Sequence, residues 1–180
     1  MFGKMNTRAE IRPVDITKDA SVCIRFFWES IEDSGSSSSH ENGEEAFLTR
    51  LSQLIIADST SCVMATVDGQ PVGDLILERF HSDPSIGWLR RIFVDRAFRG
   101  SGVADCLHAY ACSWFALRGL ARARLYCYAP ELNPRAWGFY LRHGWSQVGF
   151  GKEGPHIRLL ERQIEKEPNQ PPQPTRKTGG

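Results

Sequence analysis

A glycine-rich turn between a predicted strand and a predicted helix is the first feature of this 180-residue sequence that could do chemistry. It begins at Arg99, contains Gly100 and Gly102, and follows the apolar run that ends at Val94. A helix that starts in such a turn exposes unpaired backbone N–H groups at its positive end, and glycines let an anion approach them without a Cβ in the way. The turn indicates a phosphate or pyrophosphate site, although its spacing alone fits a structural turn equally well.

Two common nucleotide-binding loops do not fit this segment. The chain has no GxxxxGK[ST], which excludes a P-loop. Asp105 stands where a dinucleotide-binding GxGxxG site would have glycine or alanine. The five cysteines and five histidines lack the spacing of zinc ligands, so we expect no metal.

A second group of residues lies about thirty positions further on, between Asn133 and Trp145. It reads Asn133-Pro-Arg-Ala136-Trp-Gly-Phe139-Tyr140-Leu-Arg-His-Gly144-Trp145. Its tyrosine is the residue with chemical potential, because a phenol can protonate or stabilise a leaving group. Without its context, Tyr140 would be interpreted as a core aromatic on a short helix.

In this order and at this separation, the two segments resemble the two cofactor motifs of the GNAT superfamily of N-acetyltransferases, [Q/R]xxGx[G/A] and NxxAxxfYxxxGF. The resemblance covers about residues 62–150. It implies an acyltransferase that moves the acetyl group of acetyl-CoA directly to a primary amine of a small molecule. A covalent route through Cys127 has no other support in the sequence.

The resemblance also implies roles for individual residues. Backbone groups of Ile92, Phe93 and Val94 would bond the pantetheine arm of the cofactor. Backbone N–H groups from Arg99, Gly100, Ser101, Gly102, Val103, Ala104 and Asp105 would hold the pyrophosphate. Asn133 would bond the pantetheine, and Ala136 and Phe139 would line its path. Tyr140 would lie near the thioester sulfur and act on the departing thiolate.

The sequence leaves the general base open. Many GNAT enzymes carry a carboxylate in the strand before the pyrophosphate loop, but residues 86–94 contain none, and Trp88 stands near the expected position. Glu78 or His81 on the neighbouring strand end could act through water, or the acceptor could arrive already deprotonated. The missing carboxylate keeps a non-catalytic acyl-CoA-binding sensor as an alternative.

The acceptor is indicated only by a charge pattern. Six acidic residues and no lysine or arginine lie between Phe26 and Thr49, in the region that borders the acceptor site in the GNAT fold. This pattern favours a cationic amine, such as an aminoglycoside or a polyamine, although a solvated helix face explains it equally well. A protein or peptide N-acetyltransferase is the second reading within the enzyme class.

Apolar periodicity predicts the elements that position these residues. Helices are expected at 20–31, 44–57, 102–117 and 134–142, and strands at 9–13, 62–67, 71–80, 86–94, 125–129, 145–150 and 156–160. The order predicts an α/β (α+β) fold with a GNAT-like mixed, mostly antiparallel sheet of six to seven strands flanked by about four helices.

Length and composition fit one domain over residues 1–164, followed by a proline-rich, apolar-poor tail at 165–180 that we expect to be disordered. The formal net charge of +1 indicates neither a nucleic-acid nor a membrane partner. The chain has no run of about 18 apolar residues and no signal-like N-terminus, so a cytoplasmic location is expected. The resemblance also allows a homodimer, for which the sequence shows no interface.

Overall fold

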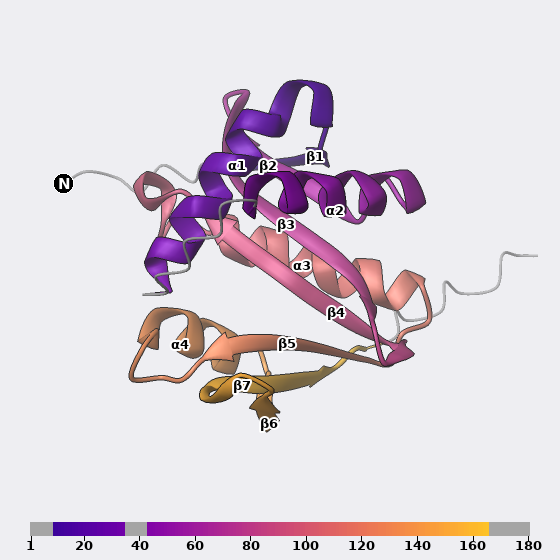
Figure 1. The fold of residues 1–180 in the computed structure, drawn as a ribbon, viewed down its shortest axis with the longest axis vertical. Coiled ribbons are helices and arrows are strands. Elements are labelled where there is room, and N and C mark those ends of the chain that lie inside the picture. The colour runs from indigo at the N-terminus through magenta and orange to yellow at the C-terminus, as the bar shows by residue number, and fades with distance from the viewer. Residues whose placement is uncertain (1–8, 35–42, 166–180) are drawn as a thin grey trace, which may run out of the picture.

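A single mixed sheet carries the fold of the computed structural model, which describes residues 9–34 and 43–165 (Figure 1). Its strands are β1 (Glu10–Pro13), β2 (Cys62–Val67), β3 (Gln70–Phe80), β4 (Asp83–Val94), β5 (Arg122–Tyr128), β6 (Ser146–Gly151) and β7 (Gly154–Gln163). The helices are α1 (Ile16–Asp33), α2 (Gly43–Ala57), α3 (Val103–Leu117) and α4 (Pro134–Arg142), with a short 3-10 turn at Arg96–Phe98. The tail expected to be disordered lies, apart from residue 165, outside the described residues.

The strand order is β1-β2-β3-β4-β5-β7-β6, and every neighbouring pair is antiparallel except β4 and β5. These two parallel strands pair only where Ile86–Trp88 faces Arg122–Arg124. Beyond that short contact they diverge, and Figure 1 shows the opening between them beside α4. The β4 edge that faces this opening keeps backbone N–H and C=O groups without a strand partner on β5.

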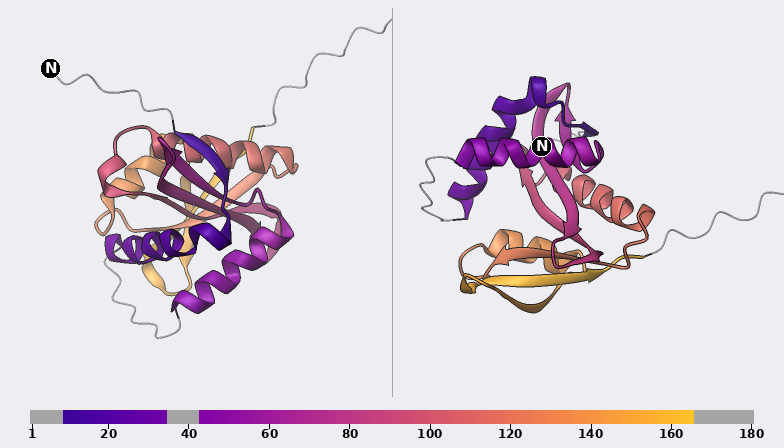
Figure 2. Two further views of the ribbon diagram at one scale, coloured as in Figure 1. Left: turned by 90° about the horizontal axis from the view of Figure 1, so that it is seen from above. Right: turned by 45° about the vertical axis from the view of Figure 1, so that its right-hand side comes forward.

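Helices cover both faces of the sheet (Figure 2). On one face α1 and α2 bury a cluster that includes Phe26, Leu51, Met64 and Phe93. On the other face α3 packs on β3 and β4 around a larger core. That core includes Leu75, Leu77, Leu107, Phe115, Leu125 and Leu160, each at most 2% exposed.

Local sequence explains several of the element boundaries. Asp68 and Gly69 both have positive φ, +50° and +77°, which is the two-residue hairpin turn that Asp-Gly favours between β2 and β3. The side chain of Asn133 accepts a hydrogen bond from the N–H of Ala136 and so caps α4, with Pro134 at the first helical position.

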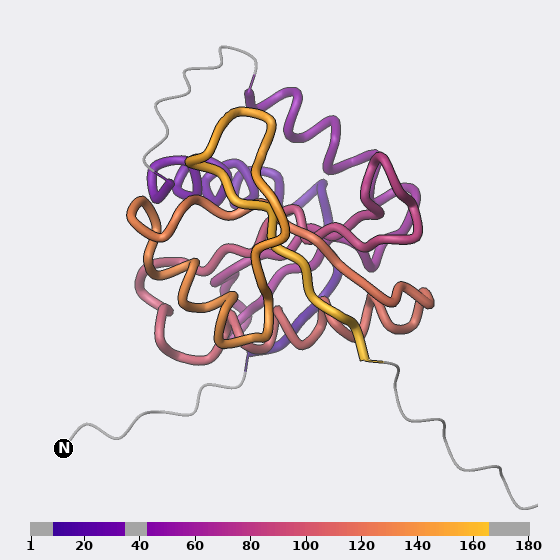
Figure 3. Tube along the Cα trace, turned by 90° about the horizontal axis from the view of Figure 1, so that it is seen from below, coloured from indigo at the N-terminus to yellow at the C-terminus, as the bar shows by residue number. Residues whose placement is uncertain are grey.

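The predicted class, strand count and helix count are confirmed, while some boundaries were wrong. Helix α1 begins at Ile16, earlier than expected, because Asp15 caps it by accepting from the N–H of Thr17. Strand β5 begins at Arg122, where the half-buried Arg122 and Arg124 alternate with the buried Ala123 and hide the apolar signal. At the end of the sheet beyond β5, the Cα trace seen from below shows β7 running next to the edge strand β6 (Figure 3).

None of the helices in the two described ranges is long and apolar enough to cross a membrane.

Candidate active site

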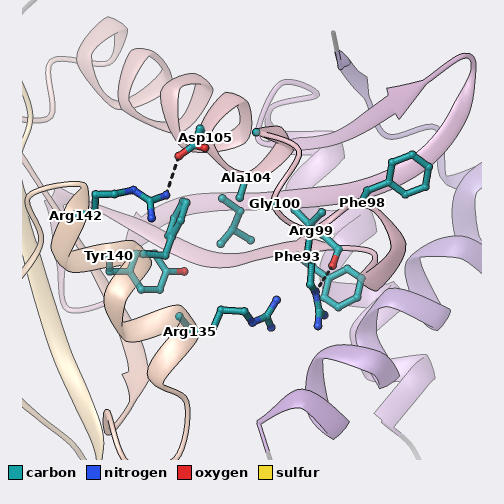
Figure 4. Close-up of a pocket in the computed structure, with 14 residues that line it drawn as sticks. Phe93, Phe98, Arg99, Gly100, Ala104, Asp105, Arg135, Tyr140 and Arg142 are labelled. Atoms are coloured by element: carbon teal, nitrogen blue, oxygen red, sulfur yellow. Dashed lines mark hydrogen bonds and ion pairs between the residues drawn. The ribbon is translucent and has the colours of Figure 1, made fainter. Parts of the chain in front are cut away.

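A cavity of about 400 Å³ lies between the N-terminus of α3 and helix α4, at the opening between β4 and β5. We call it the α3–α4 cavity (Figure 4). It is lined by Ile92, Phe93, Val94, Phe98, Arg99, Gly100, Gly102, Ala104, Asp105, Arg135, Ala136, Phe139, Tyr140 and Arg142.

The α3 end of this cavity offers backbone donors. Gly100 and Gly102 have φ of +75° and +89°, in the left-handed region that glycine adopts without strain. Gly102 is the N-cap residue, and no side chain caps the helix there. The N–H groups of the first helical turn have no acceptor within the helix, so they are available to an anion at the positive end of the dipole.

Three arginines, Arg99, Arg135 and Arg142, add positive charge to the lining. The carboxylate of Asp33, at the end of α1, pairs with Arg99 and lies 3.6 Å from an Nη2 of Arg135. Burial, followed by repulsion from Arg99, lowers the pKa of Arg135. In Figure 4, Arg99 and Arg135 point toward each other from opposite sides of the cavity. Asp33 balances only one of these two charges, so a further anion beside the two guanidinium groups would relieve the remaining repulsion.

The Tyr140 hydroxyl points into the cavity from α4 (Figure 4), and the residue is 7% exposed. Burial raises the pKa of this phenol far above its usual value, so it keeps its proton and can donate it. Cys127 is close enough to affect Tyr140, and burial raises the pKa of its thiol to about 11. A neutral, buried thiol is a poor nucleophile, which speaks against a covalent route through Cys127.

Most of the residues expected to hold the cofactor line the cavity, but Ser101, Val103 and Asn133 do not. Val103 is 1% exposed and packs in the core, so only its backbone can serve an anion. Asn133 uses its Oδ1 to cap α4, 3.1 Å from the N–H of Ala136. The sequence analysis missed Arg135 and Arg142, whose charges on the short α4 helix were the available signal.

The residues considered as bases are placed less favourably. Glu78 is held between two arginines, with oxygens 2.5 Å from an Nη2 of Arg50 and 3.0 Å from an Nη1 of Arg90. Both carboxylate oxygens of Glu78 therefore already have a guanidinium partner. His81 follows β3 and lines a separate cavity near Tyr126 and Cys127.

A buried histidine joins the helices that form the walls. Trp145 Nε1 donates to His108 Nε2 at 2.9 Å, and His143, whose ring stacks on His108, bonds Asp105 at 2.7 Å. Burial lowers the pKa of His108 to about 4. A proton on Nε2 would remove the acceptor of the Trp145 hydrogen bond, so this bond likewise favours the neutral imidazole.

We expect His108 to make the protein lose stability in mild acid. In the unfolded chain this imidazole binds a proton below about pH 6.5, whereas in the folded chain it binds one only near pH 4. The free energy of unfolding should therefore fall by about 2–3 kcal/mol across this interval because of His108. Urea denaturation at a series of pH values should show the fall, and His108→Gln, which keeps an acceptor for Trp145, should reduce it. An equal fall in the variant would contradict the assignment.

Comparisons with known proteins agree with this architecture. The sequence matches the acetyltransferase (GNAT) family over residues 25–145. No curated protein matches it significantly. Among solved structures, the PaiA N-acetyltransferase from Thermoplasma acidophilum in complex with coenzyme A is 17% identical, with 87% of this chain and 99% of that chain covered and a TM-score of 0.69.

Two further solved structures have the same fold and contain different bound molecules. The diaminobutyrate acetyltransferase EctA from Paenibacillus lautus, in complex with L-2,4-diaminobutyric acid and coenzyme A, is 18% identical over 88% of this chain and 96% of that chain, with a TM-score of 0.63. A chain of the NatC complex bound to Gag peptide and CoA is 14% identical over 88% of this chain and 99% of that chain, with a TM-score of 0.65. At these identities the likeness shows the fold.

Proposed function

The chain belongs to the acetyltransferase (GNAT) family, and we propose that it moves the acetyl group of acetyl-CoA directly to a primary amine of a small molecule. The α3–α4 cavity is the observation that carries the proposal. It combines an anion site at a helix N-terminus, three arginines and a protonated tyrosine hydroxyl beside an unpaired strand edge. The PaiA and EctA structures, both in complex with coenzyme A, support a cofactor of this kind.

In this proposal the cofactor lies along the cavity. Its pyrophosphate binds the first-turn N–H groups of α3, between Arg99 and Arg135. Its pantetheine arm runs beside Ile92–Val94, where β4 has no partner on β5 and can bond the amides of the arm as a strand would. This path directs the thioester toward the deeper part of the opening, where Tyr140 lies.

The chemical step then needs three contributions. The neutral amine attacks the thioester carbonyl carbon, a C–N bond forms, and an N–H of the β4 edge stabilises the oxygen as it gains charge. The C–S bond breaks, and the Tyr140 phenol donates its proton to the departing thiolate. The amine loses its extra proton to solvent and solvent returns a proton to the Tyr140 phenolate, so we assign no residue as general base. Glu78 is already occupied by Arg50 and Arg90.

A transfer assay tests the proposal. Acetyl-CoA is incubated with small amines and, separately, with lysine-bearing and N-terminal peptides, while free CoA and the acetylated product are measured by thiol detection and mass spectrometry. We expect equal amounts of CoA and N-acetyl product with one class of small amine. Turnover with peptides and with no small amine would mean that the acceptor is a peptide. The peptides are included because the NatC structure holds a bound peptide. Binding of acetyl-CoA without turnover would indicate a sensor, and absence of binding would refute the proposal.

We expect Arg135→Ala to weaken acetyl-CoA binding by about tenfold, because a hydrogen bond to a charged group contributes about 1.5–3 kcal/mol. Titration calorimetry with acetyl-CoA measures the change, and kcat should stay close to that of the parent protein. Arg79→Ala is the matched control, since Arg79 is an exposed arginine outside the cavity that donates to the carbonyl of Pro84. Equal affinities of the two variants would remove Arg135 from the cofactor site.

A further inference from the structure

A second cavity, of about 690 Å³, lies against the α1 and α2 helices. We call it the α1–α2 cavity. Its lining is Phe27, Ser30, Ile31, Ser34, Gly43, Ala46, Phe47, Arg50, Leu51, Leu54, Ile76, Arg90, Arg91 and Tyr128. On β4, Arg91 lines this cavity and the next residue, Ile92, lines the α3–α4 cavity. Consecutive side chains of a strand point to opposite faces of a sheet, so the two cavities lie on the two sides of β4, where it has no partner on β5.

An irregularity in the sheet brings two arginines to the same place. Ile76 faces Arg91 in the β3–β4 register, whereas Leu77 faces Leu89, so Arg90 is an extra residue in a β-bulge. A bulge changes the direction of the side chains around it. As a result both Arg90 and Arg91, although adjacent in a strand, line the α1–α2 cavity.

The lining is cationic. Arg50, Arg90 and Arg91 belong to it, and no carboxylate does among the described residues. Two carboxylates that do not line the cavity balance two of these charges. Glu78 is shared by Arg50 and Arg90, and Asp74 pairs with Arg91. Three guanidinium groups against two carboxylates leave one net positive charge beside the cavity.

These arginines also keep free hydrogen-bonding capacity. The side chains of Arg50 and Arg90 are 45% and 46% exposed, and each contacts Glu78 through one nitrogen. Arg91 has a buried Nη1 with no hydrogen-bond partner in the part of the chain that the structure describes. A guanidinium has five N–H donors in a fork that fits a carboxylate, so the cluster can accept one more anionic group.

Much of the remaining lining of the α1–α2 cavity is apolar. Phe27 and Phe47 stack with ring centroids 4.6 Å apart, and the Arg91 guanidinium lies 4.8 Å from the Phe47 centroid. Ile31, Ile76 and Tyr128 continue this surface. A ligand that fits both the arginines and the apolar part of the lining has an anionic end and an apolar body.

We infer that the acceptor is an α-amino acid with an apolar side chain, whose carboxylate is bound by Arg50 and Arg90 in the α1–α2 cavity. The inference rests on the proposed transfer reaction and specifies its substrate. The amine of such a molecule is one carbon from the carboxylate, so a carboxylate bound by this cluster holds the amine beside β4, next to the opening in which the proposed thioester lies. Its side chain lies on the Phe27–Phe47 stack.

This inference differs from the cationic acceptor that the acidic stretch favours. Among the described acids of that stretch none lines the α1–α2 cavity. Asp33 and Glu32 face Arg96, and Glu29 pairs with Arg25 at 2.9 Å. These charges are neutralised by arginines of α1 and of the loop after β4, so they exert little attraction on an acceptor.

Matched acceptors test the inference. Phenylalanine, phenylalaninamide and phenethylamine share the amine and the aromatic body, and only phenylalanine carries the carboxylate; leucine, leucinamide and isoamylamine form a second set. We expect kcat/KM to be at least about tenfold higher for the free acids, the size of a charge-assisted hydrogen bond. Because the two forms differ in amine pKa, each comparison is made at the same concentration of neutral amine.

Two variants locate the carboxylate. Arg50→Gln and Arg90→Gln should each remove most of the preference for the acid and leave the amide and the binding of acetyl-CoA unchanged. Both side chains are partly exposed, and Glu78 keeps one partner in each variant, so folding should survive. Arg79→Ala, outside both cavities, should retain the full preference.

The outcomes separate this inference from the proposed function. Amines or amides acetylated as well as the acids, or a preference unaffected by both variants, would overturn the amino-acid acceptor while the transferase stands. If no amine is acetylated, the carboxylate site can still be tested without the reaction, by measuring the binding of N-acetyl-L-phenylalanine with calorimetry. Binding that depends on Arg50 or Arg90 supports a carboxylate site there, and no binding overturns it.

Discussion

Replacing Tyr140 by phenylalanine should lower kcat for acetyl transfer by about a hundredfold and change the affinity for acetyl-CoA little. The substitution removes only the hydroxyl that points into the α3–α4 cavity (Figure 4). General acid catalysis contributes about 10²–10⁴-fold, and the buried phenol, with its raised pKa, stays protonated at neutral pH. Steady-state kinetics, together with calorimetric titration of acetyl-CoA, separates the chemical step from binding.

Tyr110→Phe is the matched control for this substitution. The Tyr110 hydroxyl lies on α3 and donates to the carbonyl of Thr60 at 2.8 Å, outside the cavity. The control should transfer acetyl groups at the parent rate. A Tyr140→Phe enzyme with parental kcat would show that the thiolate leaves without this proton donor, and the assignment of Tyr140 would be wrong.

The second large effect concerns stability. Asp74 is 2% exposed and pairs with Arg91, whose side chain is 11% exposed. Asp74→Asn leaves a buried guanidinium without its counter-charge, and removing one partner of a buried pair costs about 3–5 kcal/mol. We expect the free energy of unfolding, measured by urea denaturation, to fall by about that amount.

A double replacement distinguishes a charge effect from a packing effect. Asp74→Leu combined with Arg91→Met replaces the pair by apolar side chains of similar size, which in buried pairs is often neutral or stabilising. The double variant should unfold close to the parent protein. If Asp74→Asn costs less than about 1 kcal/mol, the pair is not buried enough to matter for stability.

How much of this could be predicted from sequence depended on whether neighbours in space were also neighbours in the chain. The strand–turn–helix arrangement around Gly100 and Gly102 could be predicted because consecutive residues form it. The place of Tyr140 on a short helix could be predicted because the surrounding residues of that helix carry the family pattern. The hairpin at Asp68–Gly69 followed from two residues alone.

What escaped the sequence depends on pairings between distant segments. Glu78 looked like a candidate base until the structure placed it between Arg50 of α2 and Arg90 of β4. Asp33 looked like part of an acidic surface, but it meets Arg96 and Arg99 beyond the end of β4. The β-bulge at Arg90 has no local sequence signal, because it exists only in the register between β3 and β4.

The brief contact between β4 and β5 also has a consequence for how the chain folds. Short turns join β2 to β3, β3 to β4 and β6 to β7, so these hairpins form between residues that are close in sequence. The parallel strands β4 and β5 are connected through α3, so pairing them closes a longer loop and costs more entropy than forming a hairpin. In return only three residue pairs form between them. We therefore expect this junction to assemble late on the folding pathway, so that the binding opening appears only when the rest of the sheet is complete.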